Sequence, residues 1–248
     1  KNTLDTVREL ETNYRTVAQF YKNTELDKVD NVSIVNASMD QLTDLDNPLF
    51  VEAIAAEFKQ NYDRLDLRDS YSILALPGYL GSNKVVEKWA KICNENKVMM
   101  VTDFANLDKP DDVVDLFHSA NLTGGELHRS NVIMTTNWLV GRGKAEEVGE
   151  EENVDLPPST SLAGKIHRTL MSQVAAGKKH GNINEVDAVK FDLKKSEISQ
   201  LEKMGLVPMV NEYGKIMAFS AKTLFTGDNI GLQTYSVVRV FDYVTKVL

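Results

Sequence analysis

Three continuous apolar runs stand in the first 140 residues, and each is long enough to form one buried strand. They are residues 71–76 (YSILAL), 98–102 (VMMVT) and 131–140 (NVIMTTNWLV). Because the apolar residues are consecutive rather than alternating, the pattern predicts strands that are covered on both faces. Helical patterns separate the runs, so the order strand, helix, strand, helix, strand predicts parallel βαβ units with right-handed crossovers.

The segments between and before these runs carry apolar residues at steps of three and four, which is typical of helices with one buried face. The first intervening helix follows a possible cap at Ser82, and the second opens at Asp108 and Pro110. Two further helices are predicted near the N-terminus, over residues 4–21 and 46–62. The apolar rows of the two intervening helices are Val85, Val86, Trp89, Ile92 and Cys93 in the first, and Val113, Val114 and Phe117 in the second.

The second half of the chain alternates between polar connectors and short ordered elements. A helix is predicted at about 161–175, with an inward row of Leu162, Ile166, Leu170 and Val174. After it come a strand within 188–193, a short helix at 196–204 that ends at Gly205, and a hairpin of the strands 206–210 and 215–220 around the turn NEYG. The last helix begins at about residue 233.

These patterns divide the chain into four segments. We expect an N-terminal helical segment (1–65), an α/β sheet unit (66–140), an exposed acidic loop (141–160) and a second part of the core (161–248). The predicted fold class is α/β, with a largely parallel or mixed sheet flanked by helices, N-terminal helices and an acidic loop insertion. Since the chain opens on Lys1 and stops within an apolar helical pattern, we expect it to be an internal piece of a longer protein.

Composition and charge exclude several classes of function. The net charge of -8 argues against nucleic acid as a partner, because binding to phosphates requires a basic face. Cys93 is the single cysteine, so no internal disulfide and no cysteine-cluster zinc site can form, and its helical spacing predicts a buried side chain rather than a nucleophile. No apolar run approaches the roughly 18 residues that span a bilayer, so no membrane insertion is expected.

Motifs for catalysis and cofactor binding are incomplete in this sequence. Gly164-Lys165 fails the P-loop pattern, because Ser159 stands at the first glycine position and Ile166 at the hydroxyl position. The turn LPGYLGS holds only Gly78 and Gly81 of a dinucleotide fingerprint, which favours a tight turn. Asp103 follows the second strand, where it is more typical of a helix-capping or loop aspartate than of a catalytic group. The histidines lack metal-ligand spacing; they are His118, His128, His167 and His180.

Two stretches resemble a known family. LPPSTSLAGKIHR resembles the Pro-Pro-Ser…Ala-Gly segment of contractile tail-sheath proteins, and GLQTYSVVRVFDYVTKVL resembles their late helix, in which an arginine precedes an aromatic and acidic patch. Within the family, the sequence looks most like the large sheath subunit of the type VI secretion system (TssC/VipB), related to phage tail sheaths. The residues that match the family's motifs are Pro157, Pro158, Ser159, Ala163, Gly164, Arg239, Phe241, Asp242 and Tyr243.

The resemblance implies a structural subunit without catalytic residues, cofactor or metal. Such a subunit pairs with a small sheath subunit (TssB/VipA-like), contacts neighbouring copies of itself, and surrounds an inner tube protein (Hcp-like) in the bacterial cytoplasm. In this interpretation the family's motif residues are structural. Pro157 and Pro158 stiffen the exit of the loop, and Ser159 or Ser161 is expected to cap the following helix.

An α/β enzyme domain remains the alternative hypothesis. A nucleotide or small ligand would then bind at the carboxyl edge of the strands 71–76 and 98–102, which is where open α/β sheets place their ligands.

Overall fold

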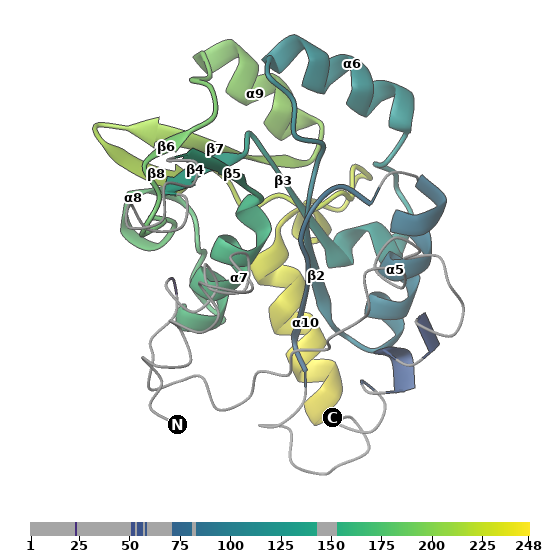
Figure 1. Cartoon of the computed structure of the whole chain (residues 1–248). Coiled ribbons are helices and arrows are strands. Elements are labelled where there is room, and N and C mark those ends of the chain that lie inside the picture. Colours follow the sequence, from purple (N-terminus) through teal and green to yellow (C-terminus); the bar gives the residue numbers. More distant parts are fainter. Residues whose placement is uncertain are drawn as a thin grey trace.

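Figure 1 shows the computed structural model of the chain, which describes Asn23 and residues 51–52, 54–56, 58, 71–80, 83–142 and 153–248. The helix predicted at 4–21 lies outside the described residues. Of the helix predicted at 46–62, the described residues are helical, and Val51, Ile54 and Phe58 are buried in the core.

A five-stranded sheet forms the centre of the molecule. In spatial order it comprises β1 (Ile73–Leu76), β2 (Met99–Asp103), β3 (Val132–Thr136), β7 (Leu206–Glu212) and β8 (Lys215–Ala218). The first four strands are parallel, whereas β8 returns antiparallel to β7 in the predicted hairpin. Every residue of β2 and β3 is buried, so the prediction of parallel strands covered on both faces is confirmed for these two strands, whereas the residues of β1 are only half-buried.

Helices cover both faces of this sheet (Figure 1). On one face, α5 (Asn83–Glu95), α6 (Pro110–Ala120) and α9 (Lys195–Lys203) bury Trp89, Phe117 and Leu201 against Met100, Val132, Met134 and Leu206. On the other face, α7 (Pro158–Arg168) and α10 (Tyr235–Val247) bury Leu162, Ile166, Tyr235 and Val238 in one cluster with Met99, Val101, Ile133 and Val207. Successive residues of each strand therefore pack into opposite layers, because the side chains of a strand alternate between the two faces of the sheet.

A second, antiparallel sheet lies beside the main one. It has the order β5 (Asn153–Leu156), β4 (Leu139–Arg142) and β6 (Ala188–Val189). The prediction of one strand over 131–140 is therefore wrong, because Asn137 adopts a left-handed conformation (φ 63°) that ends β3. Its side-chain amide donates to the carbonyls of Phe191 (2.7 Å) and Met209 (2.9 Å), which fixes the break inside the core.

Three other boundaries differ from the predictions. The interval 141–160 contains the end of β4, the strand β5 and the first turn of α7, while residues 143–152 lie outside the described part. The helix predicted at 161–175 is α7, which begins at Pro158 and ends at Arg168, so Leu170 is 66% exposed instead of packed. The strand predicted within 188–193 is reduced to β6. Short helical turns complete the fold: α8 (Gly177–His180), η3 (Leu127–Asn131) and η5 (Ile230–Gln233).

Candidate functional site

Asp103 is a buried carboxylate at the carboxyl end of β2, and it joins four parts of the chain. One oxygen accepts from the Thr135 hydroxyl (2.6 Å) and from the Ser159 amide (2.7 Å). The other accepts from the Gly78 amide (2.8 Å) and from the Ser159 hydroxyl (2.5 Å). We call this group the Asp103 junction, because it links the turn after β1, the strands β2 and β3, and α7.

The junction explains how α7 begins. Pro157 stands at the cap position and Pro158 at the first helical position, where a missing N–H costs nothing. The next amide, that of Ser159, has no acceptor within the helix, because the first amides of a helix never do. It donates instead to the Asp103 carboxylate, which lies on β2. The expectation that Ser159 or Ser161 caps this helix is wrong, since both lie inside α7 and no side chain at the cap position accepts from it.

The electrostatics of Asp103 reflect its burial. Burial raises the pKa of Asp103 to about 6, although the hydrogen bonds from Ser159, Thr135 and Gly78 favour the charged form. All four bonds come from the chain itself, so the carboxylate is occupied by structural donors. The expectation of a helix-capping or loop aspartate is met only in part: Asp103 accepts from the Ser159 amide at the start of α7, 56 positions away in the sequence, but it is itself the last residue of β2.

The motif residues Ala163 and Gly164 lie in the next turns of α7. Every residue of this helix from Pro158 to Ile166 is buried. The helix packs against β1, β2 and β3, so this stretch is an internal layer of the fold.

The second motif, on α10, divides between a buried and an exposed side. Arg239 is 9% exposed, and burial lowers its pKa. Asp242 accepts from the Asn131 side-chain amide (2.9 Å), and burial raises its pKa. Phe241 and Tyr243 face solvent with 62% and 50% of their surface exposed. The charged residues of this helix therefore turn inward, while its aromatic residues turn outward.

Polar bonds tie α10 to the amino ends of the parallel strands. Asn131, just before β3, donates to the Val98 carbonyl (3.0 Å) and accepts from Asn94 on α5 (2.9 Å). Lys246 donates to the carbonyl of Tyr71 (2.7 Å), and burial lowers its pKa to about 8. The helix is thus anchored to the edge of the sheet opposite the Asp103 junction.

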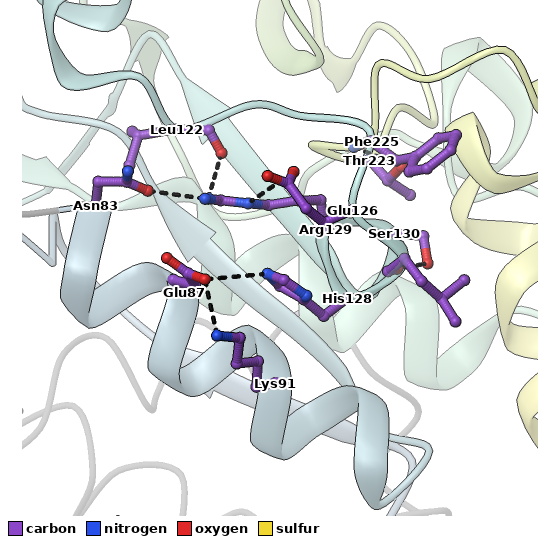
Figure 2. Close-up of polar contacts among 11 residues, drawn as sticks. Asn83, Glu87, Lys91, Leu122, Glu126, His128, Arg129, Ser130, Thr223 and Phe225 are labelled. Atoms are coloured by element: carbon purple, nitrogen blue, oxygen red, sulfur yellow. Dashed lines mark hydrogen bonds and ion pairs between the residues drawn. The ribbon is translucent and has the colours of Figure 1, made fainter.

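A polar cluster that the sequence analysis missed holds η3 against α5, as Figure 2 shows. Arg129 is 4% exposed and donates to the Leu122 carbonyl (2.6 Å) and to the Asn83 side chain (2.9 Å), with Glu126 3.9 Å away. His128 lies 3.8 Å from Glu87, and burial lowers the pKa of its imidazole. No local pattern marks these residues, because Asn83 and Arg129 are 46 positions apart.

Among the residues that the structure describes, Cys93 and the histidines do not come together in one site. Cys93 is fully buried in α5, where burial and the nearby Asp242 raise the pKa of its thiol. Within the described ranges, no group of three or more histidine, cysteine or acidic side chains could hold a metal ion. A pocket of about 90 Å³ lies between α9 and residues 222–226, far below the roughly 300 Å³ of a ligand site. No helix in the described part is long and apolar enough to cross a membrane.

A sequence model of one protein family matches nearly the whole chain. The family is described as "Type VI secretion system TssC/VipB, central domain", and the match covers residues 2–226. The chain belongs to the TssC/VipB family. A comparison with curated protein sequences gives no match.

Solved structures similar to this TssC/VipB chain share its fold at low sequence identity. A chain of the anti-feeding prophage baseplate matches with a TM-score of 0.52 and 15% identity, over 89% of this chain and 59% of that chain. The sheath tail protein of Desulfitobacterium hafniense matches with a TM-score of 0.52 and 12% identity, over 84% and 42%. The sheath tail protein of Listeria innocua matches with a TM-score of 0.50 and 10% identity, over 77% and 40%.

Two facts follow from these matches. The α/β fold, a mostly parallel sheet flanked by helices, is that of tail-sheath proteins. The chain spans 40–59% of the length of the similar solved chains.

Proposed function

We propose that this chain is a structural subunit of a contractile sheath, which assembles with a small sheath subunit around an inner tube and contracts to drive type VI secretion. The observation that carries the proposal is the match of the TssC/VipB model over residues 2–226. The tail-sheath fold of the described residues supports it independently.

The geometry of the carboxyl edge favours this function over the enzyme alternative. That alternative needs a ligand beyond the ends of β1 and β2, but the start of α7 lies there and donates two bonds to Asp103. Thr135 and Gly78 take the remaining acceptor positions. We therefore infer that the chain is not an enzyme and that the buried hydrogen bonds to Asp103 hold the fold rigid.

The partners follow from the proposed role. They are neighbouring copies of the chain, a small TssB/VipA-like subunit and an Hcp-like tube protein, all in the bacterial cytoplasm. The motif residues of α7 then act as a structural joint: Pro157, Pro158 and Ser159 fix its start, and Ala163 and Gly164 lie in its buried turns. On α10, Asp242 anchors the helix through its bond from Asn131 and Arg239 is buried, while Phe241 and Tyr243 are presented to partners.

Co-purification tests the proposal. The full-length protein is produced together with the product of its neighbouring reading frame, and only the smaller protein carries a tag. We expect both to elute in a fixed ratio as a species much larger than a heterodimer. Elution of the small protein alone, with the large one soluble and folded, would contradict the proposal.

A thermal-shift screen with nucleotides separates the enzyme alternative from the sheath proposal. A ligand that binds the native state raises the melting temperature through mass action. We expect no nucleotide to raise it by more than about a degree, because the edge of the sheet is filled by α7. A rise of several degrees with one nucleotide, lost on Asp103→Asn, would favour the enzyme.

A further inference from the structure

Helix α10 turns its charged residues toward the core and its apolar residues toward solvent. Arg239 is buried, with 9% of its surface exposed. Asp242 accepts from the Asn131 side chain (2.9 Å). Lys246 donates to the carbonyl of Tyr71 (2.7 Å). The helix has no other charged residue, so its outward side is free of charge along its whole length.

The outward side of α10 has the spacing by which one helix packs along another. Four valines follow one another at steps of three, four and three residues, which keeps one row of side chains facing a partner helix. Two aromatic residues flank this row, one on each side, because successive residues of a helix are about 100° apart. We call this surface the α10 seam, and it comprises Val237, Val240, Val244 and Val247 with Phe241 and Tyr243.

The N-terminal part of the sequence carries an apolar stripe with the same repeat. Within the helix predicted over residues 4–21, five residues follow at steps of three, four, three and four. They are Val7, Leu10, Tyr14, Val17 and Tyr21. As a helix, this stripe is about 21 Å long, which is enough to cover the α10 seam of about 15 Å. The two rows therefore match in repeat and in length.

Asn23 fixes the end of this N-terminal segment to one edge of the sheet. Its side chain accepts from the Asn184 amide (2.8 Å) and donates to the Asn184 carbonyl (3.4 Å), and only 1% of its surface is exposed. The preceding residue, Ile183, donates its amide to a carbonyl of the edge strand β8. In contrast, α10 ends near the opposite edge, where Lys246 contacts the segment just before β1.

This anchor favours the seam of a second chain over the seam of the same chain. Only Lys22 separates Tyr21 from Asn23, so the end of the stripe stays within about 7 Å of the anchor. The two edges of the five-stranded sheet are about 19 Å apart, because neighbouring strands lie about 4.8 Å apart. Figure 1 shows α8, which comes shortly before Asn184, on one side of α7 and α10 on the other.

We propose that the α10 seam receives the N-terminal segment, residues 4–21, of a second copy of this chain. The shared repeat lets the two apolar rows interdigitate along their length. Because the stripe and the seam are different surfaces, the contact is heterologous and repeats from chain to chain without closing. The inference deepens the proposed function and rests on it for its biological role, whereas the contact itself requires no sheath.

Cysteine crosslinking of the 248-residue chain tests the contact. Cys93 is fully buried and burial raises the pKa of its thiol, so an introduced cysteine reacts in its place. Tyr14→Cys places a thiol on the stripe, and Val244→Cys places one on the seam. The two proteins, distinguished by a tag on one of them, are mixed with a thiol crosslinker about 8–10 Å long, which matches the distance between packed helix axes.

Matched controls move each thiol off its apolar row. Thr12→Cys lies on the opposite side of the predicted helix, and Thr245→Cys lies beside the seam. We expect the mixture of Tyr14→Cys and Val244→Cys to give at least about fivefold more heterodimer than either control pair, because only the row positions face the partner. Val17→Cys and Val240→Cys repeat the measurement at a second pair of positions, and thermal unfolding shows that each variant is folded.

Four results would overturn the inference. The first is a yield equal to that of the controls in folded proteins, which means random collision. The second is a dimer of Val244→Cys with itself, which means that two seams pair. The third is a crosslink within one chain that carries both cysteines. The fourth is a crosslink from Val244→Cys to the co-produced small protein in place of the second copy.

The test separates this contact from the proposed function. The crosslinks form between copies of the 248-residue chain, without the small protein and without tubes. If the crosslinks form but the full-length protein never assembles with its small partner, the proposed function fails while the contact stands. If tubes form and the crosslinks do not, the contact fails and the proposed function stands.

Discussion

Asp103, Asn131 and Asn137 hold distant segments together from inside the core, and each does so through several hydrogen bonds. Asn137 and Asn131 join carbonyls and side chains of other elements, while Asp103 accepts from three segments. From the sequence, Asp103 could be predicted as a helix-capping or loop aspartate, because neither a partner base nor a glycine loop that would make it catalytic is visible beside it. Its partner Ser159 could not, because the pairing depends on the packing of α7 on the sheet.

The contribution of Asp103 to the free energy of unfolding should increase as the pH falls from 7 to 5. The folded pKa of about 6 lies above the value of about 3.9 in unfolded chains, so the folded state binds the proton more tightly over this range. The gain from this group between pH 7 and pH 5 should be roughly 1 kcal/mol.

Asp103→Asn is the control for this titration, because the variant cannot ionise at this position. Urea unfolding of both proteins at pH 5, 6 and 7 gives the difference in unfolding free energy. That difference should shift by roughly 1 kcal/mol in favour of the wild type as the pH falls. A difference that stays constant with pH would mean that the four donors outweigh the burial of the carboxylate.

Asn137→Ala should destabilise the protein by about 2–3 kcal/mol, because it removes two buried hydrogen bonds and puts alanine at a positive φ. The matched control is Asn121→Ala, where an exposed asparagine ends α6 at φ 51°. This control should cost only about 1 kcal/mol, from the backbone alone. Equal losses in chemical denaturation would show that the Asn137 side chain contributes nothing beyond its conformation.

At the scale of elements, the sequence predicts what depends on local pattern and fails where distant contacts decide. The strands β1, β2 and β3 and the helices α5 and α6 follow directly from their apolar periodicity. The break at Asn137 was missed because the apolar run continues through it into β4. The local pattern predicts the start of α7 three residues late, because the group that accepts from its first amide lies on β2 and not in the local sequence.

Helix α10 presents the least expected arrangement of side chains. Asp242 and Lys246 are bonded to residues beside the amino ends of the strands, whereas Val240, Phe241, Tyr243, Val244 and Val247 are each at least 40% exposed. The apolar periodicity predicts a helix with one polar and one apolar face, and it leads to the expectation that the apolar face packs into the core of the same molecule. An apolar face of this kind on a helix surface is typical of a contact with another protein.

Phe241→Ser should therefore raise the solubility of the 248-residue chain and leave its melting temperature within about two degrees, since surface substitutions rarely change stability by more than about 0.5 kcal/mol. Val238→Ser is the matched control: Val238 is 3% exposed, and its replacement should cost at least about 2 kcal/mol. Light scattering against concentration and thermal unfolding provide the two readouts. A large loss of stability in Phe241→Ser would contradict the exposed position of this ring.

At the scale of the whole molecule, the described residues combine a hydrogen-bonded carboxylate at the carboxyl edge of the sheet with an apolar helix face that is turned outward. The fold could be predicted as α/β with a parallel sheet, and the family through two short motifs. The second sheet and the Arg129 cluster could not, because each joins segments that are separated by tens of residues.

Electron microscopy of the full-length protein, produced together with its small partner, tests the central claim most directly. The sheath proposal predicts regular tubes of uniform diameter with a central channel and a helical repeat, and it predicts that neither protein forms them alone. Well-folded complexes that remain small and closed under the same conditions, with no helical order in any image, would contradict it.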